Sequence, residues 1–248
     1  MVTMTRHLLA DRRSQVLSWS VPSGWVALSS AAVGGGLVRP SWVVNIGVDA
    51  EFVRTDLERY AQEVAAELGH SGAGCALLTA ADVSQVEHAD CGGVRAWATV
   101  GVTKPTWPLA PGSSAVALGR PDGPKPPHSP SSGPPGELQA RAPGTINIVV
   151  ALPKSAPLSP SALVQAVGTI TEAKSQVLLQ AGVPGTGTAS DAVVVLSAPQ
   201  ESLGDPVAFA GVRSEWGQLV AQAVHTVVAA GLAAHPWPPA GVDPKILW

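Results

Sequence analysis

The chain has little charge and almost no cysteine. Lys, Arg, Asp and Glu make up 13% of its 248 residues, and the formal net charge is −3. Binding a polyanion requires clustered Lys and Arg that neutralise phosphates, so we expect no nucleic-acid partner. Cys75 and Cys91 are too few for an extracellular domain stabilised by disulfides, and we interpret both as reduced thiols.

Long apolar runs are also missing. Charged residues interrupt the N-terminal segment 1–20, which therefore lacks the apolar stretch of a secretory signal. No run approaches the roughly 18 uninterrupted apolar residues of a membrane span. We expect a cytoplasmic protein without a membrane span. The positive mean hydropathy of +0.23 then reflects Ala- and Val-rich core elements.

Common signatures of catalytic and nucleotide-binding sites do not occur. The sequence contains no G-x-S-x-G, no H-E-x-x-H, no P-loop and no dinucleotide-binding fingerprint. His70 and His88 have no spacing typical of metal ligands. We therefore expect neither a metal ion nor a cofactor.

The apolar runs that are present predict strands. Short Val-rich runs bounded by Gly and Pro are typical of strands, and a near-continuous apolar run is typical of a strand buried on both faces. Such runs lie at 24–30, 42–48, 75–80, 94–102, 145–152 and 192–198.

Capping residues predict three helices. Thr55 and Glu58 form a capping-box pattern. Ser159 and Pro160 are suited to the N-cap and first turn of a second helix, and Ser214 precedes a third. The helices are expected at about 55–68, 159–181 and 214–231.

One long segment lacks any regular pattern. Residues 104–143 are dense in Pro, Gly and Ser, which favour neither strand pairing nor burial. The parts on either side have too few elements to close a core separately. We predict a single α/β domain with a mixed β-sheet, packed helices and a long Pro- and Gly-rich insertion at about 104–143. The strand order is not derivable.

Four local strings carry a family resemblance. They are LSSAAVGGG at 28–36, TINIVV at 145–150, TEAKSQVLL at 171–179 and GTGTASDAVVV at 185–195. Together they resemble the adenosylcobinamide amidohydrolase (CbiZ) family, over roughly residues 24–232 apart from the insertion. The resemblance implies hydrolysis of the amide that joins aminopropanol to the corrin body of adenosylcobinamide, giving adenosylcobyric acid. The cobalt-containing corrinoid is then the small-molecule substrate.

The helix that carries TEAK separates its two charged residues. At about 100° per residue, Leu163, Ile170 and Val177 form one stripe, and Lys174 falls within it. Lys174 either extends along the edge of the layer or has a carboxylate or ligand partner. Glu172 lies on the opposite face, where a solvated charge is the alternative to a functional role.

The GTGTASD loop predicts a ligand cleft. Its glycines let main-chain N–H groups approach a ligand oxygen, and Thr186, Thr188 and Ser190 add hydroxyls. Such a loop can bind the developing oxyanion of an amide under attack, although an ordinary tight turn with a capping Asp is the alternative. Asp191 leads into a strand, where a carboxylate is unfavourable unless it faces a cleft.

From these patterns and the resemblance we expect Asp191 as general base, Lys174 as a stabilising charge, and Glu172 as acid or alternate base. Asn147, inside a buried strand, either holds a substrate amide or is a hydrogen-bonded structural residue. The full set of expected substrate-binding residues is Ser29, Ser30, Gly35, Asn45, Thr103, Asn147, Thr171, Thr186, Gly187, Thr188 and Ser190.

Two alternatives stay open. Departures from the family pattern near Asn45 and Arg213 favour a corrinoid-binding protein that has lost catalysis. A Thr-nucleophile hydrolase would require self-cleavage before Thr186 or Thr188, because an internal Thr lacks the free amine that would activate it. The oligomeric state does not follow from the sequence.

Overall fold

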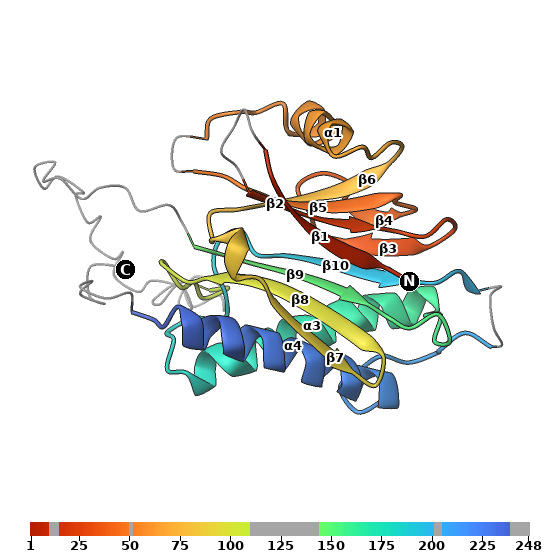
Figure 1. The fold of residues 1–248 in the computed structure, drawn as a ribbon. Helices are drawn as coiled ribbons and strands as arrows, with labels where there is room; N and C mark the ends of the chain where they lie inside the picture. Colours follow the sequence, from red (N-terminus) through yellow and green to blue (C-terminus); the bar gives the residue numbers. More distant parts are fainter. Residues whose placement is uncertain (10–14, 50–51, 110–143, 201–204, 239–248) are drawn as a thin grey trace, which may run out of the picture.

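The chain folds into four layers, with two β-sheets stacked between helices (Figure 1). The computed structural model describes residues 1–9, 15–49, 52–109, 144–200 and 205–238. Helix α1 (Leu57–Glu67) covers the outer face of the first sheet, and helices α3 (Pro160–Gln180) and α4 (Glu215–Ala234) cover the outer face of the second. Most of the predicted insertion and the last ten residues lie outside the described ranges.

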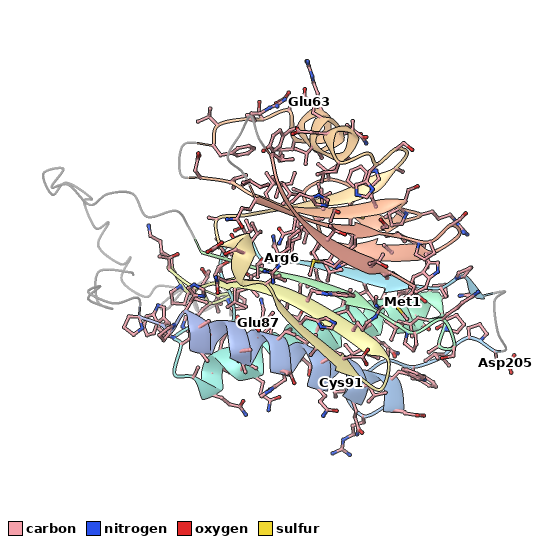
Figure 2. The ribbon with its side chains drawn as sticks, viewed as in Figure 1. Met1, Arg6, Glu63, Glu87, Cys91 and Asp205 are labelled. Carbon is pink, nitrogen blue, oxygen red and sulfur yellow. The ribbon has the colours of Figure 1, made fainter. Side chains whose placement is uncertain are left out.

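The first sheet has the strand order β1-β2-β5-β6. Its strands are β1 (Thr3–Leu8), β2 (Gln15–Ser20), β5 (Trp42–Gly47) and β6 (Gly74–Thr79). Strands β5 and β6 are parallel, and α1 connects them across the outer face, whereas the other pairs are antiparallel. On α1, Glu63 accepts from Arg54 and Arg59 at the outer surface of this layer (Figure 2).

The second sheet has the order β4-β3-β10-β9-β8-β7. Its strands are β3 (Val26–Ser29), β4 (Gly36–Val38), β7 (Glu87–Cys91), β8 (Val94–Gly101), β9 (Thr145–Ala151) and β10 (Ala192–Ser197), and a short 3-10 turn, η1 (Val83–Gln85), precedes β7. Only β9 and β10 are parallel. Their connection through α3 is the long crossover that parallel neighbours require.

The burial of strand β9 explains why this sheet is covered on both faces. All seven of its residues are buried, and side chains of a strand alternate between its two faces. Ile146 and Ile148 pack with the helices, while Val149 and Ala151 pack with residues of the first sheet. An apolar run without alternation is therefore stable only where both faces are covered.

The predicted α/β class, with mixed pairing and packed helices, is confirmed, but the strands divide over two sheets. Strands β1, β4 and β7 were not predicted, because their residues are largely exposed or polar on one face and resemble loops. Strand β2 was also missed, although its four central residues are buried. Ser159 and Ser214 cap α3 and α4 as expected, each accepting from a main-chain N–H three residues on.

The predicted capping box at the start of α1 is wrong. The N-cap is Asp56 rather than Thr55, and its side chain makes no capping hydrogen bond. Both carboxylate oxygens of Asp56 instead accept from Arg54, at 2.8 and 2.6 Å. Both oxygens are directed at the guanidinium group of Arg54, so neither caps the first turn of the helix. The pair with Arg54 also lowers the pKa of Asp56 to about 2.

Helix α4 is long and apolar enough to cross a membrane by length and composition, and it is the only such helix among the described residues. Its apolar side chains, including Val220, Val224 and Val227, are buried against the second sheet and α3. The same composition is expected for a helix buried in a protein core.

Two helical glycines give a matched test of this packing. A Cβ at Gly217, in the first turn of α4, would lie 1.8 Å from the carbonyl oxygen of Gly211, whereas a Cβ at Gly168 in α3 meets nothing within 4 Å. Gly217→Ala should lower the free energy of unfolding by about 1–3 kcal/mol through overpacking. Gly168→Ala should raise it by about 0.5–1 kcal/mol, because Ala favours helix.

Urea denaturation of both variants measures these changes. A Gly217→Ala protein as stable as the parent would contradict the close approach of α4 to the 207–213 segment.

Candidate functional site

Polar side chains gather at one end of the second sheet, where β9 and β10 begin and β8 ends. The C-terminal half of α3 and the loop 185–191 reach the same end, since this loop enters β10 directly. The predicted loop and the predicted TEAK helix therefore meet in space.

Asp191 is the centre of this cluster. Its Oδ1 accepts from the main-chain N–H of Ile146 at 2.9 Å and from the hydroxyl of Thr188. Its Oδ2 accepts from Lys174 Nζ and from the main-chain N–H of Thr188, the latter at 3.1 Å. A carboxylate has about four acceptor positions, so protein donors occupy all of them.

Lys174 supplies the charge that this carboxylate requires. The side chains of Lys174 and Asp191 are only 10% and 12% exposed, and they form an ion pair. Of the two predicted environments for Lys174, the one with a carboxylate partner is confirmed. A buried charge without a partner would be strongly unfavourable. The charge of each of the two residues therefore offsets the cost of burying the other.

Gly187 lets the pair sit against the loop. A Cβ at this position would lie 2.3 Å from Asp191 Oδ2 and 2.6 Å from Lys174 Nζ. Any larger side chain would therefore push the ion pair apart. Glycine at 187 is explained by this close approach, without reference to a ligand.

The loop is also fixed from outside. Thr106 forms an isolated β-bridge with Gly187, in which the Thr106 N–H donates to the Gly187 carbonyl at 2.8 Å and the Thr186 N–H donates to the Thr106 carbonyl at 3.0 Å. The Ser175 hydroxyl donates to the Thr186 carbonyl, and the hydroxyls of Ser190 and Thr145 are 3.0 Å apart. These contacts hold the loop to α3, β9 and the segment after β8.

A second polar cluster lies between the two sheets. Asn147 Nδ2 donates to Asn45 Oδ1 and to the carbonyl of Leu78, both at 2.9 Å, and Asn45 Nδ2 donates to Thr99 Oγ1 at 3.0 Å. All three polar residues are at most 2% exposed. Asn147 bonds to residues of the first sheet, whereas Lys174 reaches Asp191 from α3 on the outer face. The two clusters therefore lie on opposite faces of the second sheet.

Several predicted site residues lie away from both clusters. Glu172 and Thr171 are exposed on α3 and line an open hollow with Ser175, Gln176, Leu179 and Gln180. Gly35 lies in an exposed turn. Thr103 lines a hollow of about 390 Å³ with residues 80–82, 100–102 and 234–236, at the same end as the loop.

Ser29 and Ser30 have structural partners. Ser29 Oγ accepts from the Ala31 N–H at 3.0 Å, and Ser30 Oγ accepts from the Val193 N–H at 2.9 Å. Ser30 thereby joins the end of β3 to the start of β10, beside Asp191. Nearby, burial raises the pKa of the Cys75 thiol to about 11, and both cysteines are free thiols as expected.

At the loop for which the sequence predicted a ligand cleft, Lys174 and Asp191 contact each other directly. Among the hollows formed by described residues, the one lined by Thr103 and those on either side of α3 do not include either member of the pair. Within the same ranges, no three His, Cys, Asp or Glu side chains gather as a metal site would require.

Sequence reasoning missed Thr145, whose hydroxyl lies beside that of Ser190, and three further residues that complete these clusters. Thr99 is a single polar residue within a buried strand, and that signal could have paired it with Asn45 and Asn147. Ser175 lies one residue after Lys174, at the border of the buried stripe. Thr106 acts through its main chain, which leaves no signal in its side chain.

Comparison with known proteins gives consistent results. A family model described as adenosylcobinamide amidohydrolase matches residues 2–237. A protein of that name from Methanosarcina mazei is 29% identical over 209 residues, which cover 82% of this chain and 88% of the relative. The crystal structure of the PH0078 protein from Pyrococcus horikoshii OT3 matches 94% of this chain and 83% of its own, at 10% identity and a TM-score of 0.40, too distant to support an argument.

The Asp191 cluster predicts an asymmetric response to mutation. Asp191→Ala leaves Lys174 buried without its partner and removes the acceptor of three further donors, so it should lower the free energy of unfolding by about 3–5 kcal/mol. Lys174→Met should have a smaller effect, because Asp191 keeps those three donors. Urea denaturation at pH 7 measures both.

Glu172→Gln serves as the control on the exposed face of α3 and should change stability by less than about 0.5 kcal/mol. If Asp191→Ala changed stability no more than this control, the cluster would not hold the loop.

Proposed function

The chain belongs to the adenosylcobinamide amidohydrolase family, and on this premise we propose that it hydrolyses the amide bond between aminopropanol and the corrin side chain of adenosylcobinamide, releasing adenosylcobyric acid. The observation that carries the proposal is the family match over residues 2–237, which includes the whole Asp191 cluster. The protein is on this basis a hydrolase of linear amides, and its substrate is a corrinoid.

Amide hydrolysis sets requirements that the Asp191 cluster can meet. The carbonyl carbon needs a nucleophile, the developing oxyanion needs hydrogen-bond donors or positive charge, and the leaving amine needs a proton. The cluster combines a carboxylate, the ammonium group of Lys174 and the hydroxyl of Thr188. The exposed turn residues Ala189 and Ser190 add main-chain N–H groups beside them.

We assign proton transfer to Asp191 and charge stabilisation to Lys174. The two groups are in contact and nearly buried, and electrostatic interactions are strengthened where water is largely excluded. Glu172 lies on the opposite face of α3 from Lys174, since positions two apart on a helix are about 200° apart. Its predicted role as acid therefore requires a substrate that reaches around the helix.

The same geometry suggests where substrate binds. Asn45 and Asn147 are enclosed between the sheets, and Asn147 Nδ2 donates to Asn45 Oδ1, which favours the structural alternative for Asn147, while its buried Oδ1 has no hydrogen-bond partner among the described residues. Thr186, Thr188 and Ser190 are partly or fully exposed on the loop. We propose that the amide arm of the corrinoid reaches this loop while the macrocycle, larger than the hollows described above, stays outside. The expected cytoplasmic location is part of this proposal.

One observation favours a second candidate, a corrinoid-binding protein without turnover. All four acceptor positions of Asp191 are occupied by protein donors, as expected for a carboxylate whose role is structural. In that case the loop would bind the corrinoid amides and leave the substrate intact.

Incubation with adenosylcobinamide distinguishes these functions. Hydrolysis should release adenosylcobyric acid and aminopropanol in equal amounts, which chromatography of the corrinoid products measures. Asp191→Asn should lower kcat/KM by about 10²–10⁴-fold, the usual contribution of a general acid or base. Gln176→Ala, exposed on α3, is the control and should retain parental activity.

Tight corrinoid binding in an absorbance titration, with the substrate recovered unchanged, would contradict hydrolysis and support the second candidate. Intact mass spectrometry of the same sample tests self-cleavage, since a single uncleaved chain excludes a matured N-terminal Thr nucleophile. Loss of activity in Glu172→Gln equal to that of Asp191→Asn would restore Glu172 to the catalytic set.

A further inference from the structure

The hydroxyl of Thr188 differs from the other hydroxyls around the loop in the group that receives its proton. Thr188 Oγ1 donates to a carboxylate oxygen, Asp191 Oδ1. Thr106, Thr171 and Ser175 donate to main-chain carbonyls. A carbonyl oxygen cannot take up a proton at neutral pH, whereas a carboxylate can act as a general base.

The hydrogen bonds that Asp191 already accepts decide between two possible nucleophiles, a water molecule and the Thr188 hydroxyl. A water activated by this carboxylate would have to displace one of the four protein donors that fill its acceptor positions. Two of those donors are main-chain N–H groups and one is an ammonium group. The hydroxyl of Thr188 is the fourth donor, and it is the only one of the four with an oxygen that could attack a carbonyl carbon.

Local geometry fixes this contact before substrate arrives. The main-chain N–H and the hydroxyl of Thr188 both donate to the carboxylate three residues further along the chain. Lys174 and the Ile146 N–H hold the same carboxylate from the helix and strand sides. A nucleophile hydrogen-bonded to a base that a third group orients is the arrangement expected for covalent catalysis. Thr188 is also partly exposed, so a substrate can reach its oxygen.

We propose that Thr188 is the nucleophile of the hydrolysis, acting in the intact chain through a covalent ester with the corrin side chain. The inference rests on the proposed amide hydrolysis and specifies how it occurs. Asp191 replaces the free amine that an N-terminal Thr would use, so self-cleavage is unnecessary.

The steps balance without any further reactant. As Thr188 Oγ1 bonds to the amide carbon, its proton moves to Asp191 Oδ1, and the carbonyl oxygen becomes an oxyanion beside Lys174. The C–N bond then breaks while Asp191 returns the proton to the departing amine of aminopropanol. Water next attacks the ester carbon and gives a proton to Asp191. The C–O bond to Thr188 breaks, and the proton returns to Thr188 Oγ1, leaving the carboxylic acid.

The colour of the corrin provides a direct test in the unaltered protein. The protein is mixed with adenosylcobinamide, quenched in acid during the first turnovers and separated from free corrinoid under denaturing conditions. Corrin absorbance should stay with the chain, and peptide mass spectrometry should locate the adduct on Thr188. Hydroxylamine added during turnover should divert part of the product to the corrin hydroxamate, because it attacks the ester in competition with water.

Substitutions separate the nucleophile from a positioning role. Thr188→Ser keeps the hydroxyl and should retain activity within about tenfold, whereas Thr188→Ala should lose at least ~10³-fold, as removal of a nucleophile does. Thr226→Ala, whose hydroxyl donates to a main-chain carbonyl on α4, is the matched control and should keep parental activity.

A folded Thr188→Ala protein with activity within tenfold of the parent would overturn the inference while leaving the proposed function intact. Inactivity of both Thr188→Ala and Thr188→Ser, without adduct or hydroxamate, would also overturn it and leave water as nucleophile. If Thr188→Ala does not fold, the hydroxamate assay on the parent decides by its presence or absence. If the parent releases no cobyric acid, the proposed function fails and the inference fails with it.

Discussion

The carboxylate of Asp191 joins the parts of the molecule that form the candidate site. It accepts hydrogen bonds from Ile146 near the start of β9, from Lys174 on α3 and from Thr188 in the loop that precedes β10. Since β9, α3 and β10 are consecutive elements of one parallel crossover, a single side chain connects its beginning, middle and end. The position of each hydroxyl and N–H group on the loop therefore depends on a paired, nearly buried charge.

The layers explain why a charge can exist there. Strand β9 is buried on both faces, and its polar residues occur only near the end where β10 begins. The ion pair and three further hydrogen bonds to Asp191 offset the desolvation of Asp191 and Lys174, while on the opposite face Asn147 Nδ2 donates to Asn45 Oδ1. Most polar groups at this end of the sheet are thus tolerated because they bond to one another, whereas the buried Oδ1 of Asn147 has no hydrogen-bond partner among the described residues. Because most of these groups are already hydrogen-bonded within the protein, few of them are free to react with a substrate. The hydroxyl of Thr188 is important for this reason.

The sequence predicted the central elements well and the peripheral ones poorly. The runs at 145–152 and 192–198 and the helix capped by Ser159 were recognisable because burial, periodicity and capping leave local patterns. Strands β1 and β7 expose most of one face and contain His, Arg or Asp, so their composition resembles that of loops. The cap of α1 was mispredicted because Arg54, outside the capping motif, binds the Asp56 carboxylate.

By itself, the sequence determined the α/β class, the family resemblance and the placement of Lys174 on the buried face of its helix. It did so because helical periodicity and short motifs are properties of neighbouring residues. Only the tertiary structure decided that Lys174 and Asp191, 17 positions apart, form an ion pair, that Thr99 joins Asn45 and Asn147, and that Thr106 pairs with Gly187. These contacts depend on how the two sheets stack and on where strands begin, and distances between separate elements are not encoded in any local pattern.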